Sequence, residues 1–395
     1  MATGGMILAG LMGAGPAWAE LSDTVHPFVR LGYSHDNNLL RLSDNEKSLY
    51  GGDGSDNFRD ATAGVAIERP IGRQLLTGKA SVSRVSYDFF EQFDYTGKQA
   101  ELDLKWMIGN HLSGHVGGAY SQMLSGFTDF RSNERNLRTE RRAYVDGAWR
   151  FHPSWQLIGS YAESRFGYEL EEQQPNNRLE KLSAAGFDYV ASSGSTFGFQ
   201  VRRLEGNYPN QLAQGFDNSY TQDEQKINVN WLVSGTTQVL FLGGFVQRKH
   251  NTQSLRDDSG TNGRLIVNWA PRSRLTINSQ LWREFIATEG LFINNALSKG
   301  ALVKGTWEVT SKISWDAQAK YNKRDYTSFS LTGTPTNSDD ANDSTRTLSS
   351  NVTYRPRPNI ELVLGAFRDR RSGSVLARTN SYNATGVSFN ATAQF

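Results

Sequence analysis

The fold class can be predicted from one stretch of the sequence, Gln99-Ala100-Glu101-Leu102-Asp103-Leu104-Lys105-Trp106-Met107-Ile108. Every second residue from Ala100 to Ile108 is apolar, and the polar residues from Gln99 to Lys105 lie between them. Successive side chains of a β-strand point to opposite faces, so a period of two predicts a strand. The polar face carries too many charges for a buried core.

The same alternation recurs over strands of roughly 9 to 12 residues that end in tight turns. Further examples are Arg138–Trp149, Glu224–Val233, Gly263–Trp269 and Lys312–Asn322. The short turns are Pro70–Arg73, Gly109–His111, Phe151–Ser154, Ala191–Ser195, Ser234–Thr237, Pro271–Ser273, Val309–Lys312 and Arg355–Asn359. The longer polar segments include Asn37–Asn57, Gln122–Asn136, Glu205–Ser219, His250–Thr261, Thr327–Asp343 and Arg370–Asn380.

Short turns at one end of the strands and long loops at the other are typical of bacterial outer-membrane barrels. The sequence therefore predicts an all-β fold, a transmembrane antiparallel β-barrel of about 18 strands with both termini in the periplasm. Sixteen strands stay open as an alternative, because the strands around Arg73–Tyr95 and Ser279–Leu297 have indistinct ends.

A soluble propeller has a similar repeat length, but its blades use strands of about five residues. Tryptophan placement favours the barrel. Seven Trp residues lie within three residues of a short turn, on the apolar face of their strands: Trp106, Trp149, Trp155, Trp231, Trp269, Trp307 and Trp315. A ring of outward indoles at one height is typical of a membrane interface.

Composition excludes several other classes. The 395 residues include no Cys, which excludes disulfides and thiolate metal sites, and a net charge of +2 argues against a nucleic-acid partner. No run of about 20 apolar residues predicts a membrane helix. An aromatic content of 11% argues against disorder.

The two ends of the chain carry targeting features. Met6–Ala19 is a short apolar stretch ending Ala17-Trp18-Ala19, which predicts a signal peptide over residues 1–19 and a barrel over 20–395. Met1–Gly5 lack the usual basic residue, and a buried N-terminal helix is the alternative. The last strand alternates up to Phe395, and this ending resembles the signal by which the outer-membrane assembly machinery recognises its clients.

A barrel of 16 to 18 strands encloses a lumen too wide for wall side chains to fill, so transport is the leading class of function. The predicted lumenal set is balanced in charge, which favours a neutral or weakly charged solute, and Tyr144 is a candidate stacking surface for sugar rings. The alternative is that these charges only solvate and brace the wall. The pore-lining candidates are Glu101, Asp103, Lys105, Arg138, Glu140, Arg142, Tyr144, Asp146, Arg150, Glu224, Lys226, Arg264, Lys304 and Lys320.

The first predicted strand runs into a distinctive motif, Tyr-x-x-Asp-Asn-Asn-Leu-x-Arg-Leu, which contains Asp36, Asn37, Asn38 and Arg41. This motif resembles the opening of the EpsL-type outer-membrane proteins of exosortase and exopolysaccharide operons. The resemblance implies export of a polysaccharide across the outer membrane, together with periplasmic polysaccharide-export machinery as a partner. On the residues alone, Asp-Asn-Asn fits better as a simple turn held by hydrogen bonds from side chains to the backbone.

Other functions stay open. A general diffusion porin for small solutes or sugars predicts a loop folded into the lumen, for which Asn37–Asn57 is long enough. An adhesin or a purely structural barrel is a further alternative. Catalysis is disfavoured, since His115 faces inward near Ser113 without an identifiable acidic partner. No cofactor is predicted, and Asp339, Asp340, Asn342 and Asp343 fit a solvated loop tip better than a calcium site.

Overall fold

The computed structural model describes residues 24–46, 54–211, 217–252, 257–287, 295–326, 328–329, 335–336 and 341–395. Apart from strands, these ranges contain the short 3₁₀ turns η2 (Glu91–Phe93) and η3 (Glu171–Asn176). None of their helices has the length and apolar character needed to cross a membrane. The predicted signal peptide lies outside the described residues.

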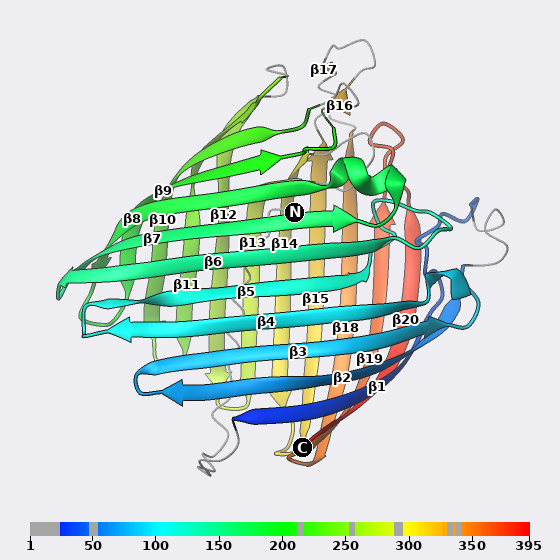
Figure 1. The fold of residues 1–395 in the computed structure, drawn as a ribbon, viewed down its shortest axis with the longest axis horizontal. Helices are drawn as coiled ribbons and strands as arrows, with labels where there is room; N and C mark the ends of the chain where they lie inside the picture. The colour runs from blue at the N-terminus through cyan, green and yellow to red at the C-terminus, as the bar shows by residue number, and fades with distance from the viewer. Residues whose placement is uncertain are drawn as a thin grey trace.

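Eighteen strands form one sheet that closes on itself (Figure 1). Each strand pairs antiparallel with the next, and the last pairs with the first from Phe28↔Gln394 to Asp36↔Gly386. The strands are β1 (Val25–Asp36), β2 (Asp56–Ile71), β3 (Gln74–Tyr87), β4 (Tyr95–Ile108), β5 (Leu112–Leu124), β6 (Leu137–His152), β7 (Trp155–Tyr168), β8 (Arg178–Val190), β9 (Thr196–Asn207), β10 (Tyr220–Ser234), β11 (Thr237–His250), β12 (Asp258–Arg272), β13 (Leu275–Ala287), β14 (Asn295–Glu308), β15 (Ile313–Tyr326), β18 (Asn342–Arg357), β19 (Ile360–Ser372) and β20 (Tyr382–Gln394). A separate small pairing joins β16 (Ser328–Phe329) to β17 (Pro335–Thr336).

The predicted 18-strand barrel is confirmed, and the 16-strand alternative is wrong. All eight short turns lie where the sequence places them. The long loops are shorter than predicted, because strands extend into their polar flanks: β19 continues to Ser372, and β12 begins at Asp258. These extensions are rich in charged residues, which a strand tolerates once it has left the apolar layer.

Glycine sets the geometry of several short turns. Gly72, Gly109 and Gly194 have φ values of 62°, 58° and 82°. Such left-handed backbone costs an L-residue energy but costs glycine almost nothing. The chain can therefore reverse within a few residues at this end of the barrel, which keeps the successive strands adjacent.

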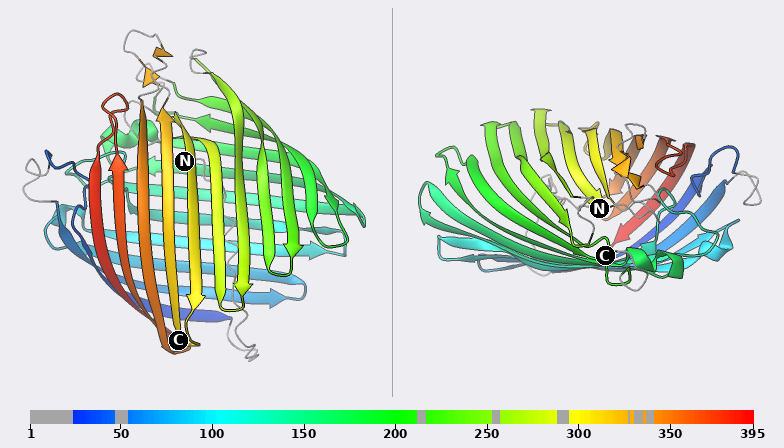
Figure 2. Two further views of the ribbon diagram at one scale, coloured as in Figure 1. Left: turned by 180° about the vertical axis from the view of Figure 1, so that it is seen from behind. Right: turned by 90° about the horizontal axis from the view of Figure 1, so that it is seen from above.

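The strands are steeply tilted, so the front wall of β2–β7 crosses the wall behind it at a large angle (Figure 1). Seen from above, the barrel is flattened rather than round (Figure 2). Flattening brings opposite walls closer than a circular section of 18 strands would. Loops and side chains from the two walls can consequently meet inside the lumen.

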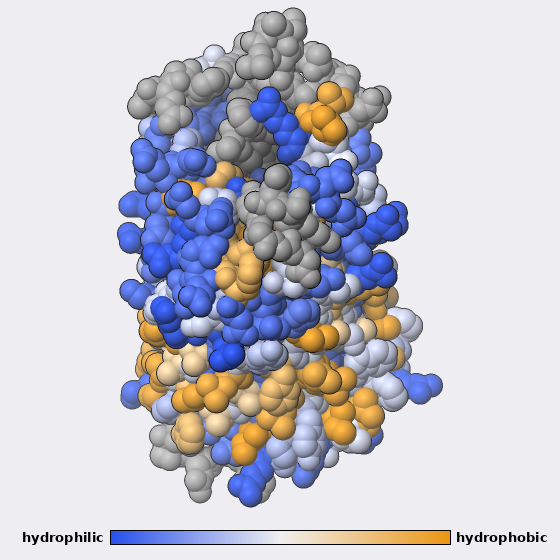
Figure 3. Space-filling view, turned by 90° about the vertical axis from the view of Figure 1, so that its right-hand side faces the viewer, coloured by the Kyte–Doolittle hydropathy of each residue, from blue (hydrophilic) through white to orange (hydrophobic). Residues whose placement is uncertain are grey.

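The outer face of the barrel has the character of a membrane protein. Figure 3 shows apolar side chains gathered in a band across the lower part of one face, with hydrophilic side chains above it. All seven predicted belt tryptophans lie on the outward face near the short turns, and six of them expose 40–51% of their surface. Trp282 alone among the described tryptophans points inward, where its indole N–H donates to Ser298. The protein is an outer-membrane β-barrel.

We expect Leu102→Arg to destabilise the barrel in lipid by about 2–4 kcal/mol, because an arginine near the middle of the lipid face is costly. Leu102 is 52% exposed on the outer face of β4, four residues before the belt residue Trp106. Urea unfolding in vesicles, followed by Trp fluorescence, measures the change. The control is Gln99→Arg on the lumenal face of β4, which should cost less than about 1 kcal/mol. Equal losses would contradict the assignment of the two faces.

Candidate functional site

Strand register determines which side chains face the lumen, because directly paired residues share a face. The structure places these predicted pore-lining residues on the lumenal face: Glu101, Asp103, Lys105, Arg138, Glu140, Arg142, Tyr144, Asp146, Glu224, Lys226, Arg264, Lys304 and Lys320. Arg150 follows a register shift in β6 and lies at the short-turn rim. Whether a solute meets these residues stays a prediction.

The sequence reasoning missed several lumenal cations. They are Arg30, Lys79, Arg178, Arg202, Arg248, Arg324 and Arg371. The alternation of the strand could have identified them: Arg324, for example, is four residues beyond Lys320 and therefore shares its face. It was overlooked because the strand ends were placed too early, so that these residues were assigned to loops or left unassigned.

Exposure of the lumenal charges falls sharply along the barrel. Near the short turns, the side chains of His115 and Asp146 are both 43% exposed, and that of Lys304 is 49% exposed. Near the long loops, the side chains of Glu224 and Arg371 are 5% and 1% exposed. The described lumen is thus open at the periplasmic end and largely filled by side chains at the extracellular end.

Five lumenal aromatic rings lie flat against the wall, each over a glycine on the neighbouring strand. A Cβ added to Gly300 would lie 2.2 Å from the Trp282 ring, and one added to Gly117 would lie 2.6 Å from the Tyr144 hydroxyl. The directly paired residues are Phe28↔Gly64, Tyr144↔Gly117, Tyr220↔Gly206, Trp282↔Gly300 and Phe367↔Gly386. Glycine at these positions lets a large ring occupy the wall without narrowing the lumen.

Each of these five rings also has a basic side chain near its face. Arg142 lies 5.6 Å from the centroid of Tyr144, Arg248 lies 4.2 Å from that of Tyr220, and Arg264 lies 5.4 Å from that of Trp282. The Tyr144 hydroxyl also donates to Asp103 at 2.6 Å. Tyr144 is consequently part of a braced wall, and its role as a stacking surface for sugar rings stays a prediction.

A cluster of opposite charges lies on the inner wall between β6 and β13. The carboxylate of Glu224 is 3.0 Å from both Arg202 and Lys226, and Arg264 pairs with Glu284 at 2.7 Å. All of these side chains except Arg264 line a cavity of roughly 70 Å³ together with Arg142, Glu180 and Asn262. The buried Asn262 Oδ1 has no hydrogen-bond partner among the described residues, so the cavity offers a polar group that a water molecule or a solute can satisfy.

The Asp-Asn-Asn motif forms a compact turn at the start of loop 1 (residues 37–55). The amide of Asn38 donates to the carboxylate of Asp36 at 2.9 Å, and the Asn38 side chain bonds the backbone of Leu42 in both directions at 2.8 Å. Arg41, with a φ of 57°, pairs with Asp36 at 2.8 Å. In this chain, the motif holds the turn by hydrogen bonds from side chains to the backbone.

The turn directs two leucines into a small apolar cluster inside the barrel mouth. Leu40 and Leu42 are 0% and 1% exposed, and they pack with Phe90 and Phe93 of the adjoining loop. Phe127 joins the cluster from loop 3 (residues 125–136), with its ring centroid 4.9 Å from that of Phe93. Loops 1 and 3 therefore support each other across the extracellular end.

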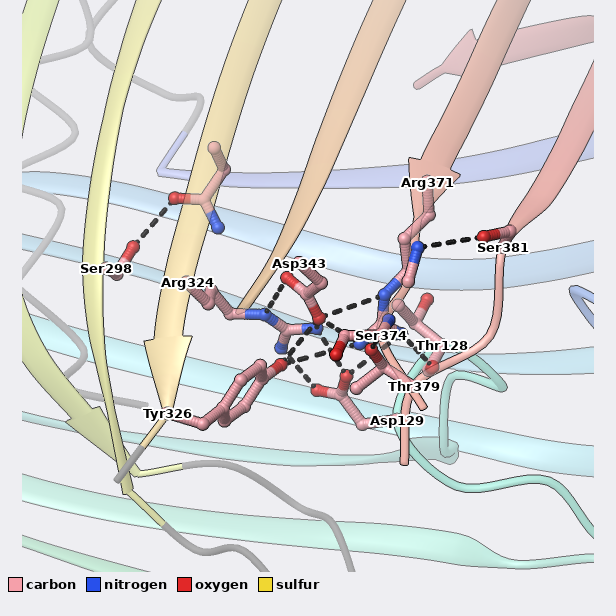
Figure 4. A network of polar contacts seen from close by, with 12 residues as sticks. Thr128, Asp129, Ser298, Arg324, Tyr326, Asp343, Arg371, Ser374, Thr379 and Ser381 are labelled. Carbon is pink, nitrogen blue, oxygen red and sulfur yellow. Dashed lines mark hydrogen bonds and ion pairs between the residues drawn. The ribbon is translucent and has the colours of Figure 1, made fainter. Parts of the chain in front are cut away.

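Loop 3 spans the lumen. It leaves the wall between β5 and β6, and Asp129 at its tip reaches Arg324 of β15 at 2.8 Å and Arg371 of β19 at 3.5 Å (Figure 4). Arg371 also donates to the Thr128 carbonyl at 2.6 Å. Because β15 and β19 lie on the far side of the sheet from β5, these contacts place a bridge of backbone across the channel.

Asp343 anchors the far side of this bridge. It accepts from Arg324 at 2.9 Å, from the Tyr326 hydroxyl at 2.6 Å and from Arg371. The residue is 1% exposed in β18, so its assignment to a solvated loop tip was wrong. The described residues contain no group of three or more candidate metal ligands, and Asp339 and Asp340 lie outside them.

The charge state of Asp129 follows from its neighbours. Burial alone would raise the pKa of this carboxyl, but the facing guanidinium groups of Arg324 and Arg371 outweigh it, and the pKa lies below its ordinary value. Asp129 therefore stays ionised, and loop 3 stays anchored, throughout the neutral and mildly acidic range.

His115 has an acidic partner that the sequence did not reveal. Its Nδ1 lies 3.7 Å from Asp146, the residue directly opposite on β6. Ser113, two residues away on β5, pairs with Ala148 instead. Acyl transfer by such a triad needs a nucleophile hydrogen-bonded to a base, and the base hydrogen-bonded to an acid. Among the described residues, no hydrogen bond joins Ser113 to His115.

Comparison with solved structures finds similarity over nearly the whole chain. OccAB3 of Acinetobacter baumannii is 10% identical, with 94% of this chain and 98% of that chain covered and a TM-score of 0.46. OpdK of Pseudomonas aeruginosa with vanillate is 10% identical, with coverage of 94% and 99% and a TM-score of 0.45. OccK2 of the same organism, in complex with glucuronate, is 8% identical, with coverage of 94% and 98% and a TM-score of 0.48. No protein-family model and no curated protein matches the chain.

We expect Asp129→Asn to release the tip of loop 3 and to raise single-channel conductance in planar bilayers. The substitution removes the charge that pairs with Arg324 and Arg371 while keeping the side-chain volume. Glu134→Gln is the matched control, because Glu134 is an exposed carboxylate of the same loop. Conductance that is unchanged in Asp129→Asn, or raised equally in both variants, would contradict the anchoring role.

Acid should also break the ion pairs of Asp129 with Arg324 and Arg371. Because the pKa of Asp129 is lower in the folded protein than in an unfolded chain, where it is near 3.9, the ion pairs stabilise the docked loop above about pH 4. That stabilisation is lost as the pH falls through the depressed folded pKa. We expect conductance to be constant between about pH 8 and 5 and to rise only below about pH 4. A transition near neutral pH would show that another group controls the loop.

Proposed function

We propose that the protein is a channel through which small neutral or zwitterionic solutes diffuse across the outer membrane. The observation that carries this proposal is loop 3 docked across the lumen through Asp129, Arg324 and Arg371. A fixed internal loop restricts an otherwise wide barrel to a size range, which is how a diffusion channel excludes large molecules.

Charge pairing supports a solute without strong net charge. In the lumen, several cations lie beside a carboxylate, as do Arg202 and Lys226 with Glu224. Arg178 likewise pairs with Glu180 at 2.8 Å. A lumen lined in this way presents both signs at close spacing, so it suits the paired charges of a zwitterion and the hydroxyl groups of a polyol.

Export of an exopolysaccharide, which the resemblance of the Asp36–Leu42 segment implies, has less support. The comparisons do not support it, and the described lumen lacks a continuous lining of one charge or of bare ring faces that would guide a polymer. Loop 3 would also have to leave its anchors before a polymer could pass. Export therefore remains a hypothesis that requires a separate opening partner.

Liposome swelling tests the proposal with solutes of graded size. We expect reconstituted protein to admit amino acids and monosaccharides, to exclude long polysaccharides, and to give a reversal potential near zero in a KCl gradient, since the lining is balanced. Asp129→Asn should raise the size limit.

Two outcomes would contradict the proposal. A barrel that is impermeable to small solutes, yet passes polysaccharide when a periplasmic extract is added, would favour export. A strong preference for anions or for cations would show that unpaired charges, rather than the paired ones, determine which solutes pass.

A further inference from the structure

The outer face of the barrel is basic near its extracellular ends. Fourteen outward-facing residues in this zone are Arg or Lys, whereas four are acidic, namely Glu163, Glu205, Asp223 and Asp325. The basic residues are Arg59, Arg84, Lys98, Arg141, Arg165, Lys181, Arg203, Lys249, Arg283, Lys299, Lys323, Arg346, Arg368 and Arg370. The outer face therefore carries a net positive charge in this zone.

The height of these residues matches the upper membrane interface. On β4, β6, β14 and β15, a basic residue stands eight positions along the strand from a belt tryptophan: Lys98 and Trp106, Arg141 and Trp149, Lys299 and Trp307, Lys323 and Trp315. Eight residues span about 26 Å of strand, or about 20 Å along the membrane normal at a tilt near 40°. The apolar band of such barrels is about 25 Å tall, so these side chains reach the headgroups of the outer leaflet.

Some of these cations already have acidic partners within the protein. Arg59 pairs with Asp88 at 3.1 Å, Arg165 with Glu163 at 2.7 Å and Arg203 with Asp223 at 2.7 Å. Others do not. Among the described residues, no acidic side chain lies within 4.0 Å of Arg346, Arg368 or Arg370.

These three arginines form a cluster on β18 and β19. Arg346 lies directly opposite Arg370, and Arg368 lies opposite Leu348, two residues along on the same outer face. All three are exposed. Like charges directly opposite each other in a sheet are destabilising, so this arrangement is unfavourable unless an anion lies between them. The Tyr321 ring, 5.9 Å from Arg346, closes one side of the cluster.

An apolar surface continues directly below the arginines. Leu348, Leu364 and Val387 are 57%, 60% and 54% exposed on the same outer faces of β18, β19 and β20. A ligand that fits both parts therefore has a multiply charged anionic head and several hydrocarbon chains. Guanidinium groups bind phosphate with paired hydrogen bonds, which favours phosphate as the anion.

We propose that Arg346, Arg368 and Arg370 form a binding site for the phosphorylated headgroup of a multi-chain glycolipid in the outer leaflet, with its acyl chains on the apolar surface below. The site lies on the lipid face and is independent of solute passage through the lumen. Bound glycolipid neutralises the arginine cluster and holds the β18–β19 wall in a defined lipid environment.

Native mass spectrometry of the barrel purified in mild detergent tests this site. The probe is lipid A with two phosphates, added at increasing concentration, and the test variant is Arg346→Gln/Arg368→Gln/Arg370→Gln. The control variant, Arg59→Gln/Arg165→Gln/Arg203→Gln, removes the same charge from arginines that have acidic partners. A difference in gel mobility between unheated and heated samples verifies that each variant is folded.

We expect the wild type and the control to retain bound lipid A and the test variant to bind it about tenfold or more weakly. Monophosphoryl lipid A should bind the wild type more weakly than the bisphosphoryl form, and phosphatidylglycerol should not displace it. Equal binding by the test and control variants would overturn the proposal, as would displacement by phosphatidylglycerol. If the triple variant does not fold, Arg370→Gln against Arg203→Gln gives the same comparison.

Discussion

Every backbone N–H and C=O group that enters a bilayer must find its partner within the protein, and here the pairing of β1 with β20 completes that requirement. Closure has consequences for each residue of the wall. It commits one face of every strand to lipid and the other to the lumen, so the sequence must alternate. It also leaves the lumen as the only place where paired charges such as Glu224 and Lys226 can lie inside the membrane layer.

Charges in such a place are costly unless they are paired, and the lumen pairs them in two ways. Carboxylates contact guanidinium and ammonium groups along and across strands, and five aromatic rings over glycines hold further cations against the wall. At the extracellular end, the same chemistry fixes a loop. Asp129 joins an existing cluster of Arg324, Asp343 and Arg371, so docking the loop adds a carboxylate where two guanidinium groups face one buried acid.

The sequence was sufficient for the barrel because local patterns encode it. Alternation, glycine-containing turns and the belt tryptophans each depend on a few neighbouring residues, and they agreed on 18 strands and on the outer membrane. The bridge of loop 3 depends on contacts such as Asp129 with Arg324, which are 195 positions apart. A contact between residues so far apart leaves no periodic pattern in the sequence. The prediction that Asp343 lies in a loop was wrong for the same reason. A run of Asp and Asn residues is typical of a loop, and only the pairing of β18 with its neighbours shows that Asp343 is buried. The partner of His115 required the β5–β6 register, and Asp146 is visible only once that register is known.

Loop 3 should rest in one position across the lumen, and a distance between two spin labels can measure this. The chain has no cysteine, and a Cβ added at Gly126 of loop 3 or at Gly305 of β14 would meet no neighbouring atom within 4 Å, so both positions have room for a labelled cysteine. Pulsed electron resonance of the labelled protein in lipid should give one narrow distance distribution that broadens when Asp129→Asn is added. A distribution that is already broad in the parent protein, and unchanged by that substitution, would contradict the account.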